Sequence, residues 1–333
     1  MSFLALSDDE LALMRFTCDL FFVEESPLYW LEEQQREPAD YAAAYHSLVG
    51  RGVIDPHGFR VTDDALNRIA PVTECDGRFT HVVQHADGTT SQSDHWMLDE
   101  IAVSYEKVAD RHVFGTDLDQ DEIVEGLARR FVPRRAGGDR VHLVLTAVEM
   151  LALGQILEEA KRDQKRELPL AALKRAFQKP APADQRPPQA PLLPMARRPM
   201  RARTGALVED AVWDDALRGL LEKGALTHSA GSVWLSNGLL DLATRPLGDR
   251  HTLVRTDFGD GDWFVRETTF VPVEGSLFFL GPRAGGVAVE ELDGERLRGA
   301  LIEAVGPLPR ERAPGGPSQR LADLLVRQEP VKA

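Results

Sequence analysis

Apolar residues recur every three to four positions in several stretches of the chain, and two of these stretches begin alike. They are SDDELALM (7–14) and TAVEMLAL (146–153). A Ser or Thr followed three residues later by Glu forms a capping box, in which each side chain bonds the other residue's backbone N–H. The pattern therefore predicts two amphipathic helices whose first residues, Ser7 and Thr146, are 139 positions apart.

A second pair of stretches repeats a helix, a turn and another helix. YHSLVGRGVID (45–55) matches LRGLLEKGALT (217–227) at an offset of 172, and GFRVTDDALNRIA (58–70) and GSVWLSNGLLDLA (231–243) follow them. Gly52 and Gly224 are placed to end the first helix of each pair, and Thr62 and Ser236 to cap the second. This order of helix, turn, helix and short strand is winged-helix-like.

A third pair of stretches alternates polar and apolar residues, as strands do. FTHVVQHADG (79–88) parallels HTLVRTDFGDG (251–261), each running into an Asp-Gly turn signal. Further strands are predicted at 101–106, 112–114, 276–280 and 287–289. Each half closes with a helix, at 117–131 and 291–305, where Asp119 and Asp293 are natural N-caps.

Three matched stretches in the same order predict an internal duplication. The expected fold is α+β: two winged-helix-like units, each with an antiparallel meander, related by a pseudo-two-fold axis and able to join their sheets. Unit 1 spans 1–135, and unit 2 spans 141–308 with a basic, proline-rich insert at about 161–205. A tail at 309–333 carries a short amphipathic helix. Pro169 is expected to interrupt the helical part of 147–178.

Charge and targeting signals bear on where the protein works. The chain of 333 residues has a net charge of −14, yet residues 161–203 hold twelve Lys and Arg against three Asp and Glu. We find no secretory signal pattern, no apolar run long enough for a membrane span, and only two cysteines. These features predict a cytoplasmic protein that does not bind membranes.

Candidate metal and catalytic sites are weak. Cys75, His81 and His85 lie close in sequence, but zinc spacing is missing, so we interpret the histidines as solvent-facing strand residues. The alternating Asp117, Asp119 and Asp121 lack the glycine and glutamate of a calcium loop. Asp257-Phe258-Gly259 fits a hairpin turn better than a kinase motif.

No phosphate loop or nucleophile elbow is found, so we predict no catalytic, cofactor-binding or metal-binding residues and no cofactor. An enzyme of an unrecognised class stays an alternative.

A DNA-associated transcriptional regulator is the principal alternative. Two helices are candidates for the recognition helix. The helix at 62–70 carries one Arg and two Asp, and the helix at 236–244 carries one Asp and no cation. Such faces repel phosphates, so nucleic acid could bind only through the basic insert at 161–203, and this reading is not favoured.

A non-enzymatic adaptor or chaperone that binds another protein fits better. Large exposed aromatics and arginines are common anchors at protein interfaces. The candidate partner-binding residues are Tyr29, Trp30, Trp96, Arg197, Arg198, Arg201 and Arg203.

The same order of elements resembles the EspG family, the cytosolic chaperones of ESX type VII secretion. The residues that carry the resemblance are Leu48–Ile54, the hairpin at Thr80–Gly88 and the closing helix at Asp119–Phe131, with their counterparts in unit 2. The resemblance implies a pseudo-symmetric α/β protein that binds a secreted helical substrate pair through its sheet and a neighbouring loop. The long basic insert departs from the family pattern.

Overall fold

A computed structural model describes residues 3–17, 20–57, 60–131, 140–163, 166–178, 210–259 and 263–307. The predicted insert arginines, Arg197, Arg198, Arg201 and Arg203, and the predicted tail at 309–333 lie outside these ranges. The predicted boundary between the units, between 135 and 141, also falls on residues that are not described.

The first half of the chain runs from β1 to α5. Its elements are β1 (Leu4–Ser7), α1 (Asp8–Thr17), α2 (Trp30–Glu33), α3 (Tyr41–Gly50), β2 (Ile54–Asp55), β3 (Arg60–Val61), α4 (Asp63–Thr73), β4 (Gly77–Gln84), β5 (Thr90–Leu98), β6 (Ile101–Val108), β7 (Arg111–Asp119) and α5 (Gln120–Ala128).

The second half runs from β8 to α11. Its elements are β8 (His142–Leu145), α6 (Ala147–Asp163), β9 (Glu167–Pro169), α7 (Leu170–Gln178), α9 (Asp210–Glu222), β10 (Leu226–Ser229), β11 (Ser232–Leu235), α10 (Asn237–Thr244), β12 (Arg250–Phe258), β13 (Trp263–Val273), β14 (Ser276–Arg283), β15 (Gly286–Leu292) and α11 (Gly294–Val305).

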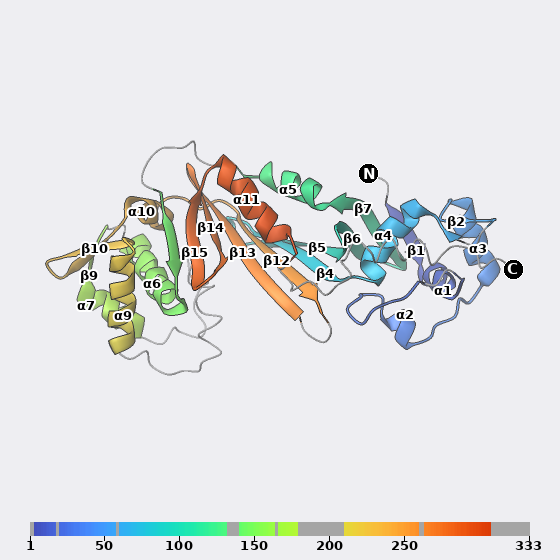
Figure 1. The fold of residues 1–333 in the computed structure, drawn as a ribbon, viewed down its shortest axis with the longest axis horizontal. Helices are drawn as coiled ribbons and strands as arrows, with labels where there is room; N and C mark the ends of the chain where they lie inside the picture. Colours follow the sequence, from blue (N-terminus) through green and yellow to red (C-terminus); the bar gives the residue numbers. More distant parts are fainter. Residues whose placement is uncertain are drawn as a thin grey trace.

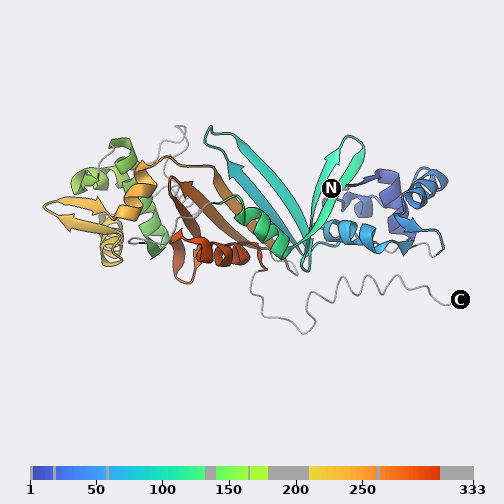
Figure 2. The same cartoon turned by 90° about the horizontal axis from the view of Figure 1, so that it is seen from above.

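One ten-stranded sheet runs through the molecule, in the order β1-β7-β6-β5-β4-β12-β13-β14-β15-β8. The two meanders join through the antiparallel β4–β12 pair, in which His81 lies opposite Leu253, a difference of 172. That difference equals the sequence offset, so this pair lies where a pseudo-two-fold axis would pass. Helical lobes lie at the two ends, while α5 and α11 lie along one face of the central strands (Figures 1 and 2). The fold is therefore α+β, as predicted; the duplication and the winged-helix likeness stay predictions.

The two predicted capping boxes form and are tied to their lobes in the same way. Glu10 accepts a hydrogen bond from the Ser7 N–H (2.7 Å), and Glu149 accepts one from the Thr146 N–H (2.7 Å). Each glutamate also binds the cation at the end of the lobe's second long helix, Arg51 in one half (2.7 Å) and its counterpart Lys223 in the other (2.5 Å). These ion pairs fix α1 to α3 and α6 to α9.

The second predicted pair of helix caps is only partly right. Thr62 and Ser236 occupy the N-cap positions of α4 and α10, but neither side chain accepts a capping hydrogen bond. The Thr62 hydroxyl instead donates to the Gly52 carbonyl (3.1 Å), which ties α4 to the preceding turn. Asp119 and Asp293 do cap α5 and α11 through their side chains.

Gly52 and Gly224 end α3 and α9 with φ of +70°, a conformation that costs other residues about 1 kcal/mol or more. No atom lies within 4 Å of a Cβ built on Gly52 or on Gly50, the last residue of α3, so crowding does not enter. We expect Gly52→Ala to lower the free energy of unfolding by about 1 kcal/mol and Gly50→Ala to raise it by up to about 1 kcal/mol. Urea unfolding measures both, and equal effects would contradict the assignment of the strain to φ.

Candidate protein-binding surface

The central strands present two different faces. On the inner face, Phe79, Leu253 and Phe270 are buried against α5 and α11, in a core completed by Leu297 and Leu301. Each such leucine or phenylalanine contributes about 1.5–3 kcal/mol through burial. Because side chains alternate along a strand, the neighbouring residues point to the opposite face.

We call the opposite side of these strands the open sheet face. It comprises half-buried or exposed side chains of the four central strands: Val82, Gln84, Gln92, Thr252, Val254, Trp263, Val265 and Glu267. Farther out, the same side of the sheet is covered. Trp96 and Val103 pack in the core of the first lobe, and Val271 and Phe278 in that of the second. The open sheet face therefore lies between the two helical lobes.

A row of aromatic rings leads from the first lobe to this face. Trp96 is 6.5 Å from Phe258 between ring centroids, and Phe258 meets Trp263 edge to face at 5.7 Å. The guanidinium of Arg78 lies 5.5 Å from the Trp96 ring centroid. Trp96 itself is only 9% exposed, so the expectation that it is an exposed anchor was wrong. Its ring supports the row from within, because it packs in the lobe's core.

The start of β13 carries the most exposed run of large apolar residues that the structure describes. Trp263, Phe264 and Val265 are 66%, 50% and 60% exposed. Adjacent exposed apolar residues of this size mark interaction sites more often than isolated ones do. Sequence reasoning missed them, although WFV closely follows the predicted turn signal Asp260-Gly261.

Buried charged side chains lie on the inner side of β12 and β13. Arg255 and Asp257 on β12 are almost fully buried and form an ion pair at 2.5 Å. On β13, Arg266 donates to the carbonyls of Ala304 and Gly306 at the end of α11, and burial lowers its pKa. The exposed residues at the start of β13 are therefore directly followed by a residue that is hydrogen-bonded to the end of α11.

The other predicted partner-binding aromatics are less available. Tyr29 and Trp30 are half-buried at the start of α2. The Trp30 ring already has two cations of its own chain near it, Lys107 at 5.3 Å and Arg36 at 5.7 Å from the ring centroid. Neither residue adjoins the open sheet face by any contact found in the structure, and their role in binding stays a prediction.

A buried relay lies beside Trp30 and was not anticipated from the sequence. His112 has no exposed surface. Its Nε2 lies 2.6 Å from a carboxylate oxygen of Asp8, and its Nδ1 lies 2.8 Å from the hydroxyl oxygen of Tyr105. Carboxylate, imidazole and hydroxyl in series can activate a hydroxyl. Burial, however, raises the pKa of Tyr105 to about 12, which opposes its ionisation. We interpret the relay as a link between α1 and the β6–β7 hairpin.

His81 is buried at the centre of the sheet, so its expected solvent-facing position was wrong. Its Nε2 lies 3.0 Å from Nδ1 of His251, the rings stack, and Phe131 meets His251 edge-on. His85 instead contacts Asp249 at 2.9 Å, while Cys75 packs in the first lobe. Among the described residues, no group of three His, Cys, Asp or Glu is placed to hold a metal ion.

Burial, followed by the neighbouring His251 and Arg130, lowers the pKa of His81 to about 4. The unfolded chain, with an ordinary histidine pKa near 6.5, binds a proton between pH 6.5 and 4 that the folded chain does not bind. The free energy of unfolding should therefore fall as pH falls through this window, by up to about 2 kcal/mol at pH 5 from His81 alone. His81→Leu, which copies the Leu253 counterpart, should flatten urea midpoints measured across this range; an unchanged slope would refute the assignment.

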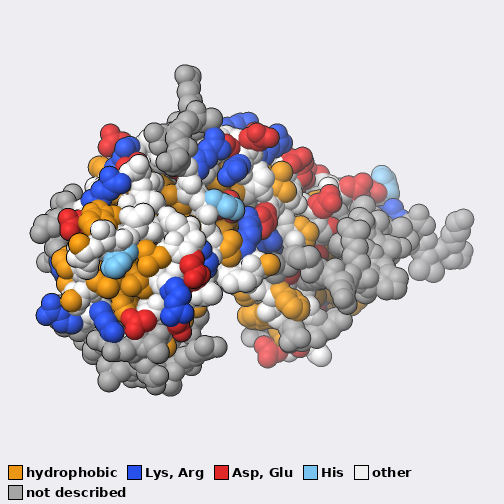
Figure 3. Space-filling view, turned by 60° about the vertical axis from the view of Figure 1, so that its left-hand side comes forward, with side chains coloured by type: hydrophobic (Ala, Val, Ile, Leu, Met, Phe, Trp, Pro, Cys, Tyr) orange, Lys and Arg blue, Asp and Glu red, His pale blue; other side chains and the backbone are white. Residues whose placement is uncertain are grey.

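The candidate recognition helices do not gain a basic surface on folding. Arg68, the one cation predicted for the first of them, is buried on α4 and pairs with Asp64 (2.9 Å). On α10, Leu239 and Leu242 are buried. Basic and acidic side chains are mixed around hydrophobic ones over the second lobe's end of the molecule (Figure 3). These placements give no support to DNA binding by either helix.

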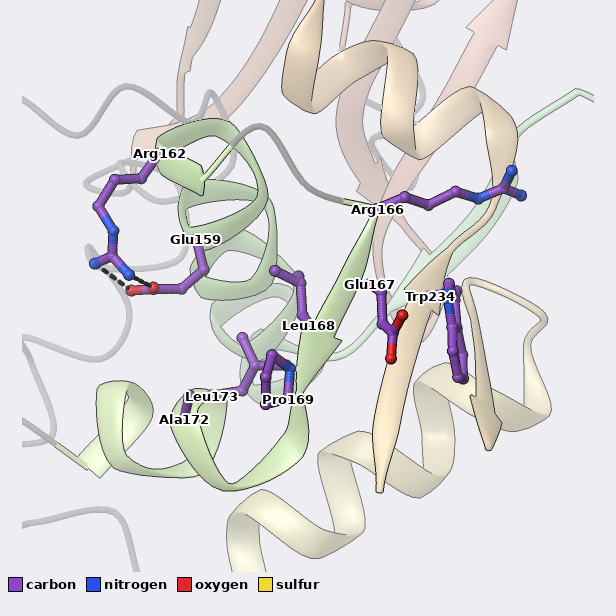
Figure 4. Close-up of a pocket in the computed structure, with 9 residues that line it drawn as sticks. All are labelled: Glu159, Arg162, Arg166, Glu167, Leu168, Pro169, Ala172, Leu173 and Trp234. Atoms are coloured by element: carbon purple, nitrogen blue, oxygen red, sulfur yellow. Dashed lines mark hydrogen bonds and ion pairs between the residues drawn. The ribbon is translucent and has the colours of Figure 1, made fainter. Parts of the chain in front are cut away.

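A separate hollow of about 720 Å³ lies in the second lobe, between α6, β9 and α7. Leu168, Pro169 and Leu173 lie side by side in it, Arg162 pairs with Glu159 at one rim, and Arg166 extends away toward the other (Figure 4). Strand β9 was not predicted; it adds to β11 directly after the Arg166 position and puts Glu167 opposite Trp234.

No helix in the described ranges is long and apolar enough to cross a membrane.

Comparison with known proteins gives one kind of match. No protein-family model matches the sequence, and no curated protein matches it. Among solved structures, the chain is similar to the type VII secretion system chaperone EspG5 of Mycobacterium tuberculosis, determined in complex with a PE25-PPE41 dimer. The identity is 10%, the match covers 94% of this chain and 99% of that chain, and the TM-score is 0.45. A likeness of this degree assigns neither a family nor a partner to this chain.

Proposed function

We propose that this chain is a non-enzymatic, cytoplasmic adaptor or chaperone that binds another protein on the open sheet face. The observation that carries the proposal is the exposure of Trp263 and Val265, which lie on the open sheet face of β13 beside half-buried side chains, while Phe264 between them points to the inner side. Aromatic residues on a fixed backbone lose little conformational freedom on binding, which makes them effective anchors. A role in a secretion-type system, and descent of the two halves from one duplicated unit, belong to the same proposal.

The surface has the composition expected of a protein-binding site. Apolar anchors at Trp263 and Val265 share this face with polar side chains that can form hydrogen bonds with a partner. Glu267 is two residues from Val265, and Gln84 and Gln92 lie farther along the sheet. The lobes on either side restrict how a partner can approach. Because the exposed anchors Trp263 and Val265 both lie on β13, in the second half of the chain, the two halves would contact a partner unequally.

Photo-cross-linking in cells tests the proposal. A benzophenone amino acid at Val265 should give one dominant cross-linked protein. The matched control carries the same group at Ile302, which is 43% exposed on α11 and so belongs to the other side of the sheet. The same products from both positions, or none from Val265, would argue against a partner on the open sheet face.

A further inference from the structure

We infer that the partner binds through an extended segment, which adds as a strand to an unpaired edge of β13 beside Trp263 and Val265. The segment carries apolar side chains at consecutive positions, so that it covers both faces of β13. This inference rests on the proposed function and names the part of the partner that the site recognises.

Strand β13 has a neighbouring strand on both sides along only part of its length. On one side it pairs with β12 from Trp263 to Phe270. On the other side it pairs with β14 only from Thr269 to Val273. Figure 1 shows β12 and the start of β13 diverging together from β14 and β15. Before Thr269, β13 therefore has no adjoining strand on its β14 side within the described ranges.

The backbone groups of Trp263 and Val265 point out of this edge. Along a strand, the N–H and C=O of one residue point to one side and those of the next residue to the other. The Pro272 carbonyl accepts from the N–H of Gly248, just before β12, so the even-numbered residues of β13 turn toward β12 and the odd-numbered ones toward β14. Among the described residues, no group bonds the N–H or C=O of Trp263 or Val265. A strand that pairs here would bond all four groups.

The facing strand does not offer the same pairing. Beyond Leu280, β14 continues through Gly281 and Pro282 beside β15 alone. Pro282 has no N–H to donate, and its carbonyl accepts from the side chain of Arg283 (3.3 Å). Proline and lysine are common means of keeping a sheet edge unpaired, and residues 263–266 contain neither. The edge of β13 is therefore the one to which a strand can be added.

The exposure of Phe264 distinguishes a strand from other occupants. Trp263 and Val265 lie on the open sheet face and Phe264 points to the inner side, yet all three are at least half exposed. A helix on the open sheet face would cover Trp263 and Val265 but leave Phe264 in water. A strand beside β13 puts its own side chains alternately on the two faces, next to all three. Consecutive apolar residues are typical of a strand that is buried on both faces, which defines the chemistry of the partner segment.

The first meander has a similar free edge with a different surface. Strand β5 pairs with β6 only from His95 to Leu98, so its earlier residues border a gap as well. Leu98 and Ile101 close a two-residue turn and so exchange hydrogen bonds, which means that the N–H of Thr90 also points into its gap. The exposed side chains at 90–93 are polar, and a strand added there would cover them at a cost. The β13 edge is therefore favoured, and Thr90 offers a control.

Proline substitution at the edge tests the inference by titration calorimetry with the cross-linked partner. Val265→Pro removes the N–H that points into the gap together with the valine side chain, whereas Val265→Ala removes the side chain alone. We expect Val265→Pro to weaken binding at least about tenfold more than Val265→Ala does, because the added strand loses a hydrogen bond and meets the proline ring. The control Thr90→Pro removes an N–H from the β5 edge and should bind like the wild type.

Phe264→Ser gives a second test that does not depend on how β13 accepts proline. Phe264 is half exposed, so the variant should fold like the wild type. Because an added strand covers the inner side of β13 as well, the variant should bind the partner about tenfold more weakly. Wild-type affinity of Phe264→Ser would overturn the inference, and so would equal affinities of Val265→Pro and Val265→Ala.

Two further results separate the inference from the proposed function. If Trp263→Ser with Val265→Ser weakens binding while Phe264→Ser does not, the partner lies on the open sheet face without adding a strand, and the inference alone fails. If Val265 gives no cross-linked protein, the proposed function itself fails. Light scattering of the chain alone addresses a second copy: a dimer that Val265→Pro converts to a monomer would assign the edge to self-association and overturn the inference.

Discussion

Replacing Asp257 by alanine should lower the free energy of unfolding by about 3–5 kcal/mol, the largest stability effect that we predict. Asp257 is the ion-pair partner of Arg255, and both side chains are almost completely buried on the inner side of β12. Removing the carboxylate leaves a guanidinium charge without its counterion in a region that water does not reach, and such losses typically cost this much.

The neighbouring strand β4 leaves room for the Arg255–Asp257 ion pair by having a glycine beside it. Gly77 on β4 lies opposite Asp257 in the register, and a Cβ there would be 2.9 Å from Nη2 of Arg255. The double variant Arg255→Met, Asp257→Ala removes both charges and should recover most of the lost stability. Urea unfolding of the wild type and the two variants gives the comparison, and a double variant as unstable as Asp257→Ala would contradict the charge argument.

Loss of the exposed anchors should act on binding and leave stability almost unchanged. We expect Trp263→Ser combined with Val265→Ser to weaken binding of the cross-linked partner at least about 30-fold, which corresponds to roughly 2 kcal/mol for removing an interface hot spot. Because both side chains are largely exposed, the free energy of unfolding should change by less than about 1 kcal/mol.

Ile302→Ser is the matched control for that measurement, since it also replaces an exposed apolar residue by serine but on α11. The affinity of the Ile302→Ser variant for the cross-linked partner, measured by titration calorimetry, should equal that of the wild type. Equal losses in both variants would mean that the partner responds to general surface apolarity and not to the start of β13.

Sequence patterns predicted the parts of the fold that depend on local chemistry. The capping boxes at Ser7 and Thr146, the glycine caps at Gly52 and Gly224, and the aspartate caps of α5 and α11 all occur where they were predicted. These features depend on side chains and backbone groups within a few residues of each other, so spacing alone specifies them.

Features set by distant contacts escaped prediction. His81 alternates correctly along β4 but becomes buried because α5 and Phe131 pack over the strand's inner face. Strand β9 forms because β11 pairs with it. In this pair Leu168 lies opposite Val233, which is 65 residues later in the sequence. Trp263 was missed because its exposure depends on which distant elements pack against the start of β13, and a run of apolar residues in the sequence would ordinarily indicate burial.

Hydrogen exchange of the chain with and without its cross-linked partner tests the central claim most directly. If the partner binds on the open sheet face, amides at the start of β13 (Trp263–Glu267) and in the adjoining part of β12 (Thr252–Thr256) should gain protection, while the exposed side of α11 around Ile302 exchanges as before. Protection confined to α11, or to the second lobe around Trp234, with no change at Trp263–Glu267, would contradict it.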